Sequence, residues 1–351
     1  MGSTIDDVAK LAEVSRQTVS RALNTPNMLS SETLRKVNKA IEMLDYHPNI
    51  TARNLAINIV KTIGLFMPFT VQQIQQNMFF SVISATMCQH CTVNDFVFQL
   101  FTALPDEHYS SLFKRLYREK RVGGLVITCP SVNIQDVMEL ISAQIPFVLI
   151  GRPAIELEEV NYVDVDNVQA AYLATHYLLE LGHRRIALLN APRHMTLSED
   201  LRKGLQQAFL DFSLPLDQIS ECFTDLTLDS GYRSAVDLLH DQERPTAFLT
   251  ADDLLAVGAK KAADHQGLSI PHDLSLISAI KNGWGDLLPF ELSHIDAPFE
   301  QLGILSAEYL VDRIQSKSHT HIRKILPVQL VSGESCGLPS DTRLANILEG
   351  R

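Results

Sequence analysis

The sequence predicts a small all-α unit at the N-terminus, followed by an α/β body of two parallel-sheet lobes. Apolar residues recur at helical spacing through roughly the first 44 residues, and capping residues precede each run. From Thr62 onward, short apolar strands alternate with helical segments in two consecutive runs. Because such alternation is typical of parallel sheets with right-handed crossovers, two runs predict two similar lobes.

The N-terminal unit begins with two short predicted helices. Thr4 is expected to cap the first, with Asp7 at the capping-box position, and Ser15 is expected to cap the second. The outward face of the second helix is polar and carries Arg16, Gln17, Ser20 and Arg21. Such side chains read base edges and phosphates, so the pattern predicts a helix-turn-helix with a DNA recognition helix. A small helical subdomain with a solvated polar face would show the same spacing.

The next segment favours the DNA-binding interpretation. A third helix is expected from Ser30 to near Tyr46, because the residue before Pro48 is pushed out of helical geometry. The stretches DVAKLAEVSRQTVSRALN, YHPN and ARNLA together resemble the headpiece and hinge helix of the LacI/GalR family, the lactose/galactose repressor-type bacterial transcription regulators. The resemblance extends to about Gly337. It departs at Glu13, where the family usually has Gly, so the turn there is expected to be either remodelled or slightly strained.

The resemblance implies a domain organisation and a DNA surface. It implies a helix-turn-helix headpiece over 1–48, a hinge helix and linker over 49–61, a two-lobed effector-binding and dimerisation domain with a periplasmic-binding-protein-like fold over 62–337, and a tail over 338–351. The residues that it places on DNA are Thr4, Ser15, Arg16, Gln17, Thr18, Ser20, Arg21, Asn24, Tyr46, Asn49, Ala52 and Leu55. Leu55 is expected to wedge into the minor groove of a palindromic operator bound by a homodimer or tetramer.

In the body, the periodicity predicts specific elements. Strands are expected over 62–68, 96–100, 124–128, 147–150, 186–189, 247–250 and 274–278, with a second run beginning near Tyr162. Helices are expected over 77–90, 107–120, 134–143, 168–181, 231–239 and 254–266. A segment from about Glu291 to Val331 is expected to cross between the lobes.

Charge and composition limit the partners. The chain of 351 residues has a net charge of −11, but residues 1–61 carry +2 and the remainder −13, so we expect only the head to touch DNA. There is no run of 18 apolar residues and no basic-then-apolar leader, which predicts a cytoplasmic protein with no membrane partner. Five scattered cysteines predict free thiols in a reducing compartment.

Enzyme chemistry is not indicated by any motif. The sequence has no P-loop, no dinucleotide-binding glycine motif and no nucleophile elbow. The pair Cys88 and Cys91 is half of a zinc pattern without a second half, and His319 and His321 lie in a polar loop. Asp252-Asp253 fits one cleft residue plus one helix N-cap better than a catalytic carboxylate pair. We therefore expect no enzymatic activity, no metal and no cofactor.

The resemblance also implies a cleft for a small-molecule effector, sugar-like or another small metabolite. The residues expected to bind it are Phe69, Asn77, Phe80, Arg152, Asp166, Arg202, Asp252, Asn282 and Trp284. Aliphatic Leu201, Leu226 and Ile280 stand where the family has an Arg, an aromatic residue and an Asp that hold a sugar. This predicts an effector other than a simple hexose, with an apolar part or an acidic group. The alternative is that Arg202 and Asn282 have slipped into the vacant roles.

The expected function is therefore transcriptional regulation, most simply repression of a catabolic or transport operon. A solute-binding module without a regulatory role is the alternative, but such a module has neither headpiece nor hinge. Whether the effector is an inducer or a corepressor stays open.

Overall fold

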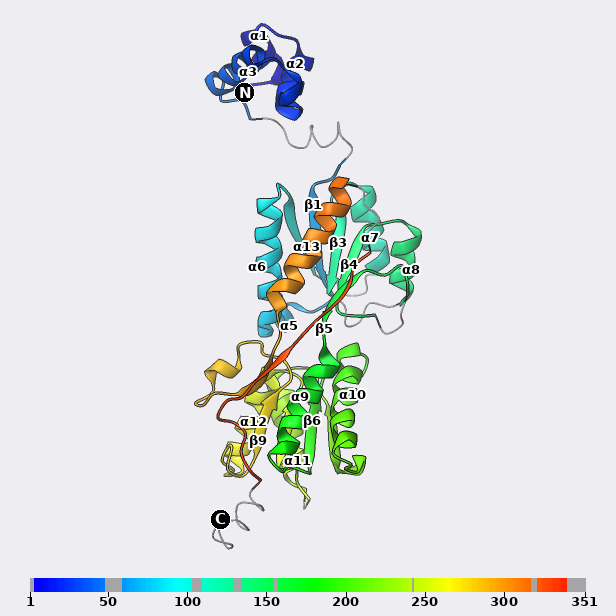
Figure 1. The fold of residues 1–351 in the computed structure, drawn as a ribbon, viewed down its shortest axis with the longest axis vertical. Coiled ribbons are helices and arrows are strands. Elements are labelled where there is room, and N and C mark those ends of the chain that lie inside the picture. The colour runs from blue at the N-terminus through cyan, green and yellow to red at the C-terminus, as the bar shows by residue number, and fades with distance from the viewer. Residues whose placement is uncertain are drawn as a thin grey trace. The chain divides into compact units, whose positions relative to one another are not determined.

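The computed structural model describes residues 3–47, 59–102, 109–128, 134–153, 157–241, 243–316 and 321–339. The chain divides into two compact units, Met1–Val60 and Lys61–Arg351, which we call the headpiece and the body and describe separately (Figure 1). The predicted hinge residues Asn49, Ala52 and Leu55 and most of the predicted tail lie outside the described residues.

The headpiece consists of three α-helices and one 3-10 turn. Its elements are α1 (Ile5–Leu11), α2 (Arg16–Asn24), η1 (Pro26–Met28) and α3 (Ser31–Met43). The predicted caps are confirmed: Thr4 and Asp7 form a capping box, and Ser15 Oγ accepts the N–H of Thr18 at 3.1 Å. The helices pack around a small apolar core of Val8, Ala9, Ala12, Val19, Ala22, Val37 and Ala40. Because the apolar face of α2 packs into this core, its polar face is left exposed to solvent.

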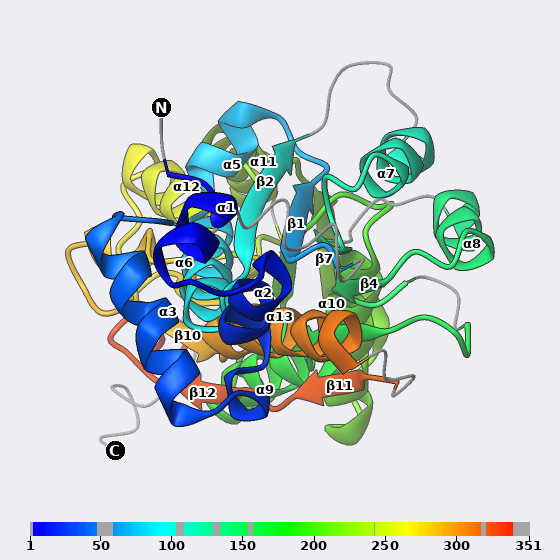
Figure 2. The same cartoon turned by 90° about the horizontal axis from the view of Figure 1, so that it is seen from above.

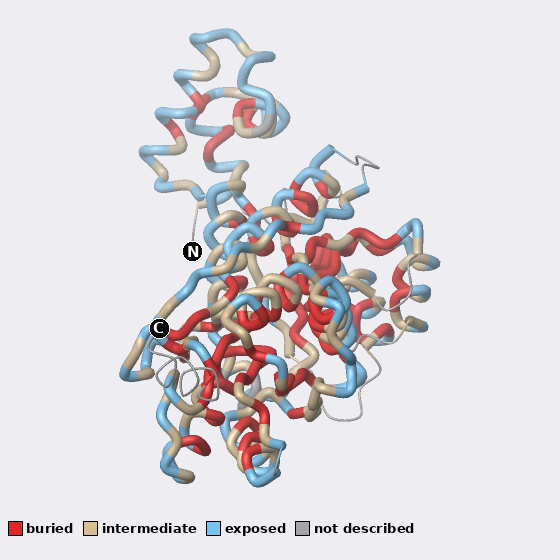
Figure 3. Tube along the Cα trace, turned by 60° about the horizontal axis from the view of Figure 1, so that its bottom comes forward, coloured by how far each residue is buried: buried red, intermediate tan, exposed pale blue. Residues whose placement is uncertain are grey.

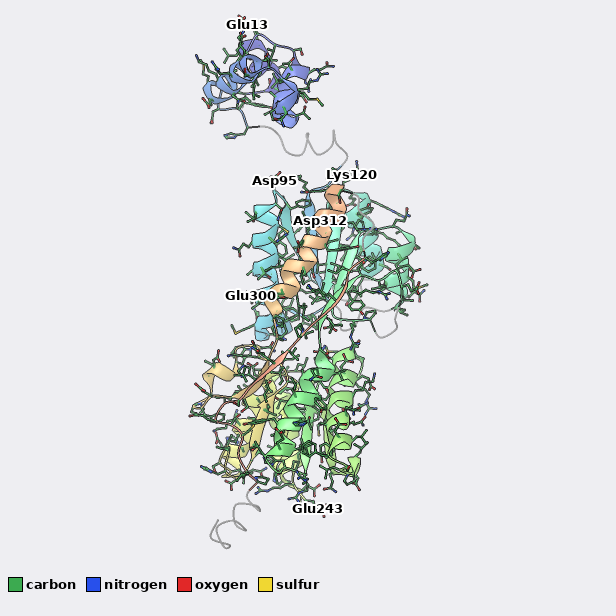
Figure 4. The ribbon with its side chains drawn as sticks, viewed as in Figure 1. Glu13, Asp95, Lys120, Glu243, Glu300 and Asp312 are labelled. Carbon is green, nitrogen blue, oxygen red and sulfur yellow. The ribbon has the colours of Figure 1, made fainter. Side chains whose placement is uncertain are left out.

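Glu13 lies in the turn between α1 and α2, and its φ of 53° is in the left-handed region (Figure 4). The expected departure from the family pattern is therefore accommodated by a strained backbone, not by a remodelled turn. The turn is held by the N–H of Val14, which donates to the carbonyl of Ala9 at 3.0 Å.

Glu13→Gly is expected to stabilise the headpiece by about 1 kcal/mol, because glycine adopts a positive φ without the Cβ clash. Hydrogen exchange of α1 and α2 amides in the full chain would show roughly fivefold greater protection. Asp45→Gly is the matched control, since Asp45 also has a positive φ of 45° but aspartate tolerates it better. An equal or larger gain at Asp45 would contradict the assignment of the strain to Glu13.

The first lobe of the body is built on a six-stranded sheet. Its strands lie in the order β11 (Arg323–Leu326), β5 (Tyr162–Val165), β4 (Phe147–Ile150), β3 (Gly124–Thr128), β1 (Thr62–Met67), β2 (Val97–Thr102), all parallel. The helices of this lobe are α5 (Val71–Gln76), α6 (Met78–Val93), α7 (Tyr109–Arg118), α8 (Ile134–Ser142) and α13 (Phe299–Ser316). Helices α6 and α13 pack side by side on one face, and α7 and α8 cover the other (Figures 1 and 2).

The second lobe repeats this plan. Its strands lie in the order β12 (Gln329–Val331), β10 (Ser293–Asp296), β9 (Ser275–Ser278), β8 (Ala247–Thr250), β6 (Ile186–Asn190), β7 (Ile219–Phe223), and only β12 is antiparallel. The remaining elements are α9 (Asn167–Glu180), α10 (Thr196–Asp211), η2 (Leu216–Gln218), α11 (Leu228–Leu239), α12 (Asp253–His265) and η3 (Gly285–Leu287). The buried residues, red in Figure 3, lie in the interior of the body.

The chain passes between the lobes three times, after β5, after β10 and after β11. The predicted crossing in 291–331 is thus confirmed. The assignment of the strand near Tyr162 to the second run is wrong, because β5 pairs with β4 and completes the first sheet. Helix α10 and strand β7 were not predicted from the sequence, because α10 is rich in charged side chains and β7 is only half-buried.

Among the described helices, none combines the length and the apolar character needed to span a membrane.

Candidate functional site

The outward face of α2 is the candidate DNA-reading surface. Arg16, Gln17 and Arg21 are exposed, and the buried Val19 and Ala22 hold the opposite face against the headpiece core. Arg16 Nε lies 3.8 Å from Asp6 Oδ1 in a pair that is about two-thirds exposed on both sides, which leaves the guanidinium free to turn toward a phosphate or base.

The other predicted DNA residues have structural contacts as well. Thr4, Ser15 and Thr18 are occupied in helix caps, with Ser15 Oγ 2.9 Å from Thr18 Oγ1. Tyr46 packs against the headpiece core, and Ser20 is half-buried. Of the side chain of Asn24, and of Asn49, Ala52 and Leu55, the structure gives no description.

The second candidate site is a pocket between the two sheets of the body, which we call the interlobe pocket. Its cavity volume of about 170 Å³ is many times the ~10–15 Å³ that one water requires. The lining residues are Phe69, Asn77, Phe79, Phe80, Thr128, Ile150, Gly151, Arg152, Asp164, Val165, Asn167, Met195, Thr196, Leu197, Asp225, Leu226, Asp252, Ile280, Asn282, Phe299 and Leu302. Most follow the carboxyl ends of parallel strands, where ligands bind in open α/β sheets.

Two apolar walls face each other in this pocket. The first lobe contributes an aromatic wall, in which the rings of Phe69 and Phe80 lie 4.7 Å apart and those of Phe79 and Phe299 lie 5.0 Å apart. The second lobe contributes the aliphatic side chains Met195, Leu197, Leu226 and Ile280. Leu226 has a φ of 60°, an unfavourable conformation for leucine that places the residue in the wall.

Arg152 lies on the polar side of the pocket, directly after β4. Its Nη2 contacts a carboxylate oxygen of Asp200, and its Nε lies 3.4 Å from Asp164 Oδ2. Burial lowers the pKa of the guanidinium, but the two carboxylates outweigh this, so the pKa is above its ordinary value. Desolvation raises the pKa of the Asp164 carboxyl to about 6, against the opposing effect of Arg152.

Asp252 and Asn282 form a second polar pair. Asp252 is the N-cap of α12, where Oδ1 accepts the N–H of Leu255 at 3.0 Å and Oδ2 accepts Nδ2 of Asn282 at 3.3 Å. Asn282 Oδ1 is buried and accepts no hydrogen bond from any described group, which leaves an acceptor for a ligand N–H or O–H. Desolvation, supported by the charge of Asp253, raises the pKa of Asp252 to about 7.

Six of the nine predicted effector residues line the pocket together: Phe69, Asn77, Phe80, Arg152, Asp252 and Asn282. The other three lie elsewhere. Asp166 is the N-cap of α9 and accepts the N–H of Gln169, while Asp164 and Asn167 on either side line the pocket instead. Trp284 precedes η3 and is not among the lining residues.

Arg202 is the third residue outside the pocket lining, and its contacts bear on the alternative in which Arg202 takes over the role lost at Leu201. Its Nε binds Glu221 at 3.1 Å and its Nη1 binds Glu199 at 2.9 Å, and the guanidinium lies over the ring of Phe223. Arg202 is therefore held by these partners and does not line the pocket, and Leu201 before it is fully buried in the core of the second lobe. In this structure, Arg202 does not take the vacant role in the pocket.

Sequence reasoning missed several lining residues, notably Phe79, Phe299, Asp225 and Thr196. Asp225 follows β7, a strand that the sequence analysis did not predict, and Thr196 begins α10, which was also not predicted. The sequence carries only a weak signal for Asp225, because the strand before it includes Ser220 and Glu221 and is not a continuous apolar run.

No group of three or more potential metal-ligating side chains occurs among the residues that the structure places. Cys88 is exposed and Cys91 is buried in α6, and both are free thiols.

Comparison with known proteins yields two family matches. The pattern described as "Bacterial regulatory proteins, lacI family" matches residues 4–49. The pattern described as "Periplasmic binding protein-like domain" matches residues 175–336.

Individual relatives agree with these matches. The chain is 35% identical to the HTH-type transcriptional regulator AglR of Rhizobium meliloti, over 79% of this chain and 78% of that protein. It is 30% identical to the HTH-type transcriptional repressor PurR of Klebsiella pneumoniae, over 90% of this chain and 91% of that protein.

Solved structures share both the headpiece and the body. The lac repressor dimer bound to operator and the anti-inducer ONPF has a TM-score of 0.82 at 25% identity, covering 96% of this chain and all (100%) of that chain. The complex of the transcriptional regulator CelR with cellobiose has a TM-score of 0.73 at 27% identity, covering 95% of this chain and 99% of that chain.

Proposed function

Because the chain belongs to the lacI family of bacterial regulatory proteins, we propose that it binds a two-fold symmetric operator as a homodimer, under the control of an effector in the interlobe pocket. It is a DNA-binding transcriptional regulator controlled by a small molecule, and not an enzyme. The alternative of a solute-binding module without a regulatory role is not supported, because residues 4–49 match the DNA-binding family.

The observation that carries the operator proposal is the exposed face of α2, with Arg16, Gln17 and Arg21 on a helix docked by its apolar side. Two such helices in a dimer would read half-sites about one helical turn, roughly 34–36 Å, apart. Selection of bound sequences from random DNA should return a near-palindrome. A single asymmetric site, or a monomer by light scattering at micromolar concentration, would count against the dimer.

Arg21→Ala is expected to cost ~1–3 kcal/mol of operator affinity and to relax base preference at one position in each half-site. The reason is that a guanidinium on the exposed face of a recognition helix can form paired hydrogen bonds with a guanine edge. Binding to all single-base operator variants would measure this. Lys39→Ala, which removes an exposed cation from α3, is the control and should weaken all sequences about equally. A uniform loss for Arg21→Ala would mean that Arg21 contacts only phosphate.

For the effector, we propose a sugar-like molecule that carries an apolar or aromatic part. CelR is complexed with cellobiose and the lac repressor with ONPF. In this chain, the aliphatic Leu226 and Ile280 in the wall offer no partner to a sugar hydroxyl, and an unpaired buried hydroxyl costs ~1–3 kcal/mol. The walls instead suit a ring face or an aglycone, with the polar end on Asp252 and Asn282.

A thermal-shift screen of the purified protein tests this proposal, because a bound ligand stabilises the native state. Aryl and alkyl glycosides should raise the melting temperature more than the parent hexoses at equal concentration. A free hexose that binds at micromolar concentration, with no gain from an aglycone, would refute the assignment.

A further inference from the structure

Arg152 is the one basic side chain among the described residues that line the interlobe pocket. A buried guanidinium beside a ligand site would ordinarily favour a carboxylate or phosphate on the ligand, because the paired hydrogen bonds are strong in a desolvated site. The surroundings of Arg152 determine whether it is available for that role.

Two buried carboxylates lie against this guanidinium, and its Nε is close to one of them without forming a hydrogen bond to any described group. Asp164 on β5 lies beside Nε and also accepts the backbone N–H of Arg152 at 3.1 Å. Asp200 on α10 contacts Nη2, and its side chain is only 5% exposed. The group of three therefore carries a net negative charge, and it is held inside the protein where solvent screens it weakly.

The contact with Asp200 also joins the lobes. Arg152 follows a strand of the first sheet, whereas Asp200 lies on the first helix after β6 of the second. Thr196 Oγ1 on the same helix donates to the backbone carbonyl of Arg152 at 3.2 Å, which fixes the backbone of Arg152 from the same side. Asp200 itself does not line the pocket. It nevertheless contacts Arg152, the only basic side chain among the described lining residues.

The rest of the pocket adds no compensating positive charge. Asp225 and Asp252 line it as well, and Asn282 Oδ1, a buried lining atom without a described hydrogen-bond partner, is an acceptor. A ligand phosphate or carboxylate would meet acceptors and acidic groups on several sides.

We propose that Asp200 is a specificity-determining residue that neutralises Arg152 and thereby excludes anionic effectors, such as sugar phosphates and sugar acids, from the pocket. This inference rests on the proposed effector role of the same pocket. The sequence predicted an effector with an apolar part or an acidic group. The proposal disfavours the acidic group, because Arg152, its only cationic partner among the described lining residues, is paired with Asp200.

The test uses inorganic phosphate as the ligand and the full-length protein in chloride buffer of constant ionic strength. Asp200→Asn keeps the shape of the side chain and removes its charge. Calorimetric titration should show phosphate binding to D200N at least about tenfold tighter than to the wild type, since a freed guanidinium offers charge-assisted hydrogen bonds. The double variant R152M/D200N should lose this gain.

Glu221→Gln is the matched control, because Glu221 neutralises Arg202 in the same lobe but outside the pocket. This variant should bind phosphate no better than the wild type. Equal gains in D200N and E221Q, or no gain in a D200N protein that melts cooperatively, would overturn the proposal. If D200N does not fold, the wild type decides: phosphate binding that is abolished by Arg152→Lys overturns the proposal, and absence of phosphate binding supports it.

Operator binding by the wild type is measured in parallel with these titrations. If the wild type bound no operator under any condition, the proposed function would be wrong, but the phosphate titrations would still report on the role of Asp200. Operator binding with phosphate held by wild-type Arg152 would overturn only this inference.

Discussion

Arg152→Met is expected to destabilise the body by about 3–5 kcal/mol at pH 8, because it leaves two buried carboxylates without their cation. The side chains of Asp164 and Asp200 are 10% and 5% exposed, so water cannot replace the guanidinium at full strength. Methionine fills much of the space of the arginine stem, so the loss reports the missing charge more than a cavity. Urea unfolding followed by circular dichroism measures it.

The loss should shrink as the pH falls. Burial already raises the pKa of Asp164 to about 6 in the presence of Arg152, and removal of the cation raises this pKa further. A carboxyl whose pKa is raised in the folded state destabilises that state at high pH, and the penalty disappears as the group protonates. The deficit of the variant at pH 5 should therefore be clearly smaller than at pH 8.

Arg202→Met is the matched control, because the partners of Arg202 are more exposed, with Glu221 at 21% and Glu199 at 50%. It should cost about 1 kcal/mol, with little change between pH 5 and pH 8. If Arg152→Met lost no more stability than this control, or lost more at pH 5 than at pH 8, the unpaired buried carboxylates would not be the main cause of the loss.

Asp252→Asn is expected to stabilise the body by about 3 kcal/mol at pH 8, in exchange for weaker effector binding. The carboxyl of Asp252 is buried, and desolvation raises its pKa from 3.8 to about 7. The cost of holding it ionised is therefore absent below about pH 4 and complete above about pH 7. Asparagine caps a helix as well as aspartate does, so the N-cap of α12 is kept.

The bond to Asn282 can also be kept in this variant. Asn282 Oδ1 has no partner among the described groups, so a flip of this amide lets it accept from the new Asn side chain. Thermal unfolding at pH 8 and pH 4 measures the effect. Asp166→Asn, at the less buried N-cap of α9, should change the free energy of unfolding by less than about 0.5 kcal/mol. A destabilised Asp252→Asn protein at pH 8 would refute the burial argument.

Local signals predicted the elements that the chain builds from neighbouring residues. The headpiece helices were predictable because Thr4, Ser15 and Ser30 each cap a run with one apolar face. The inner strands β3, β4 and β8 were predicted at their observed bounds, since a fully buried parallel strand is a continuous apolar run. The membership of β11 in the first sheet could not be predicted, because its pairing with β5 joins residues about 160 positions apart.

A site residue could be predicted where a charged side chain follows closely after a predicted strand, as Arg152 and Asp252 do. It was not predictable where two adjacent residues compete for one role. Asp164 and Asp166 are chemically identical, and only the helix geometry of α9 assigns one to the pocket and the other to the cap. Likewise, only the observed pairing of Arg202 with Glu221 shows that its side chain is unavailable.

The three passages of the chain between the lobes affect how the protein is made on the ribosome. The first sheet has five of its strands by Val165 but receives its sixth, β11, only after Leu326 has been synthesised. At roughly 5–20 residues per second, the unpaired edge of β5 waits about 8–30 s for that strand. During this interval β5 presents unsatisfied backbone groups to other nascent chains, so slowing translation within the second lobe should increase aggregation.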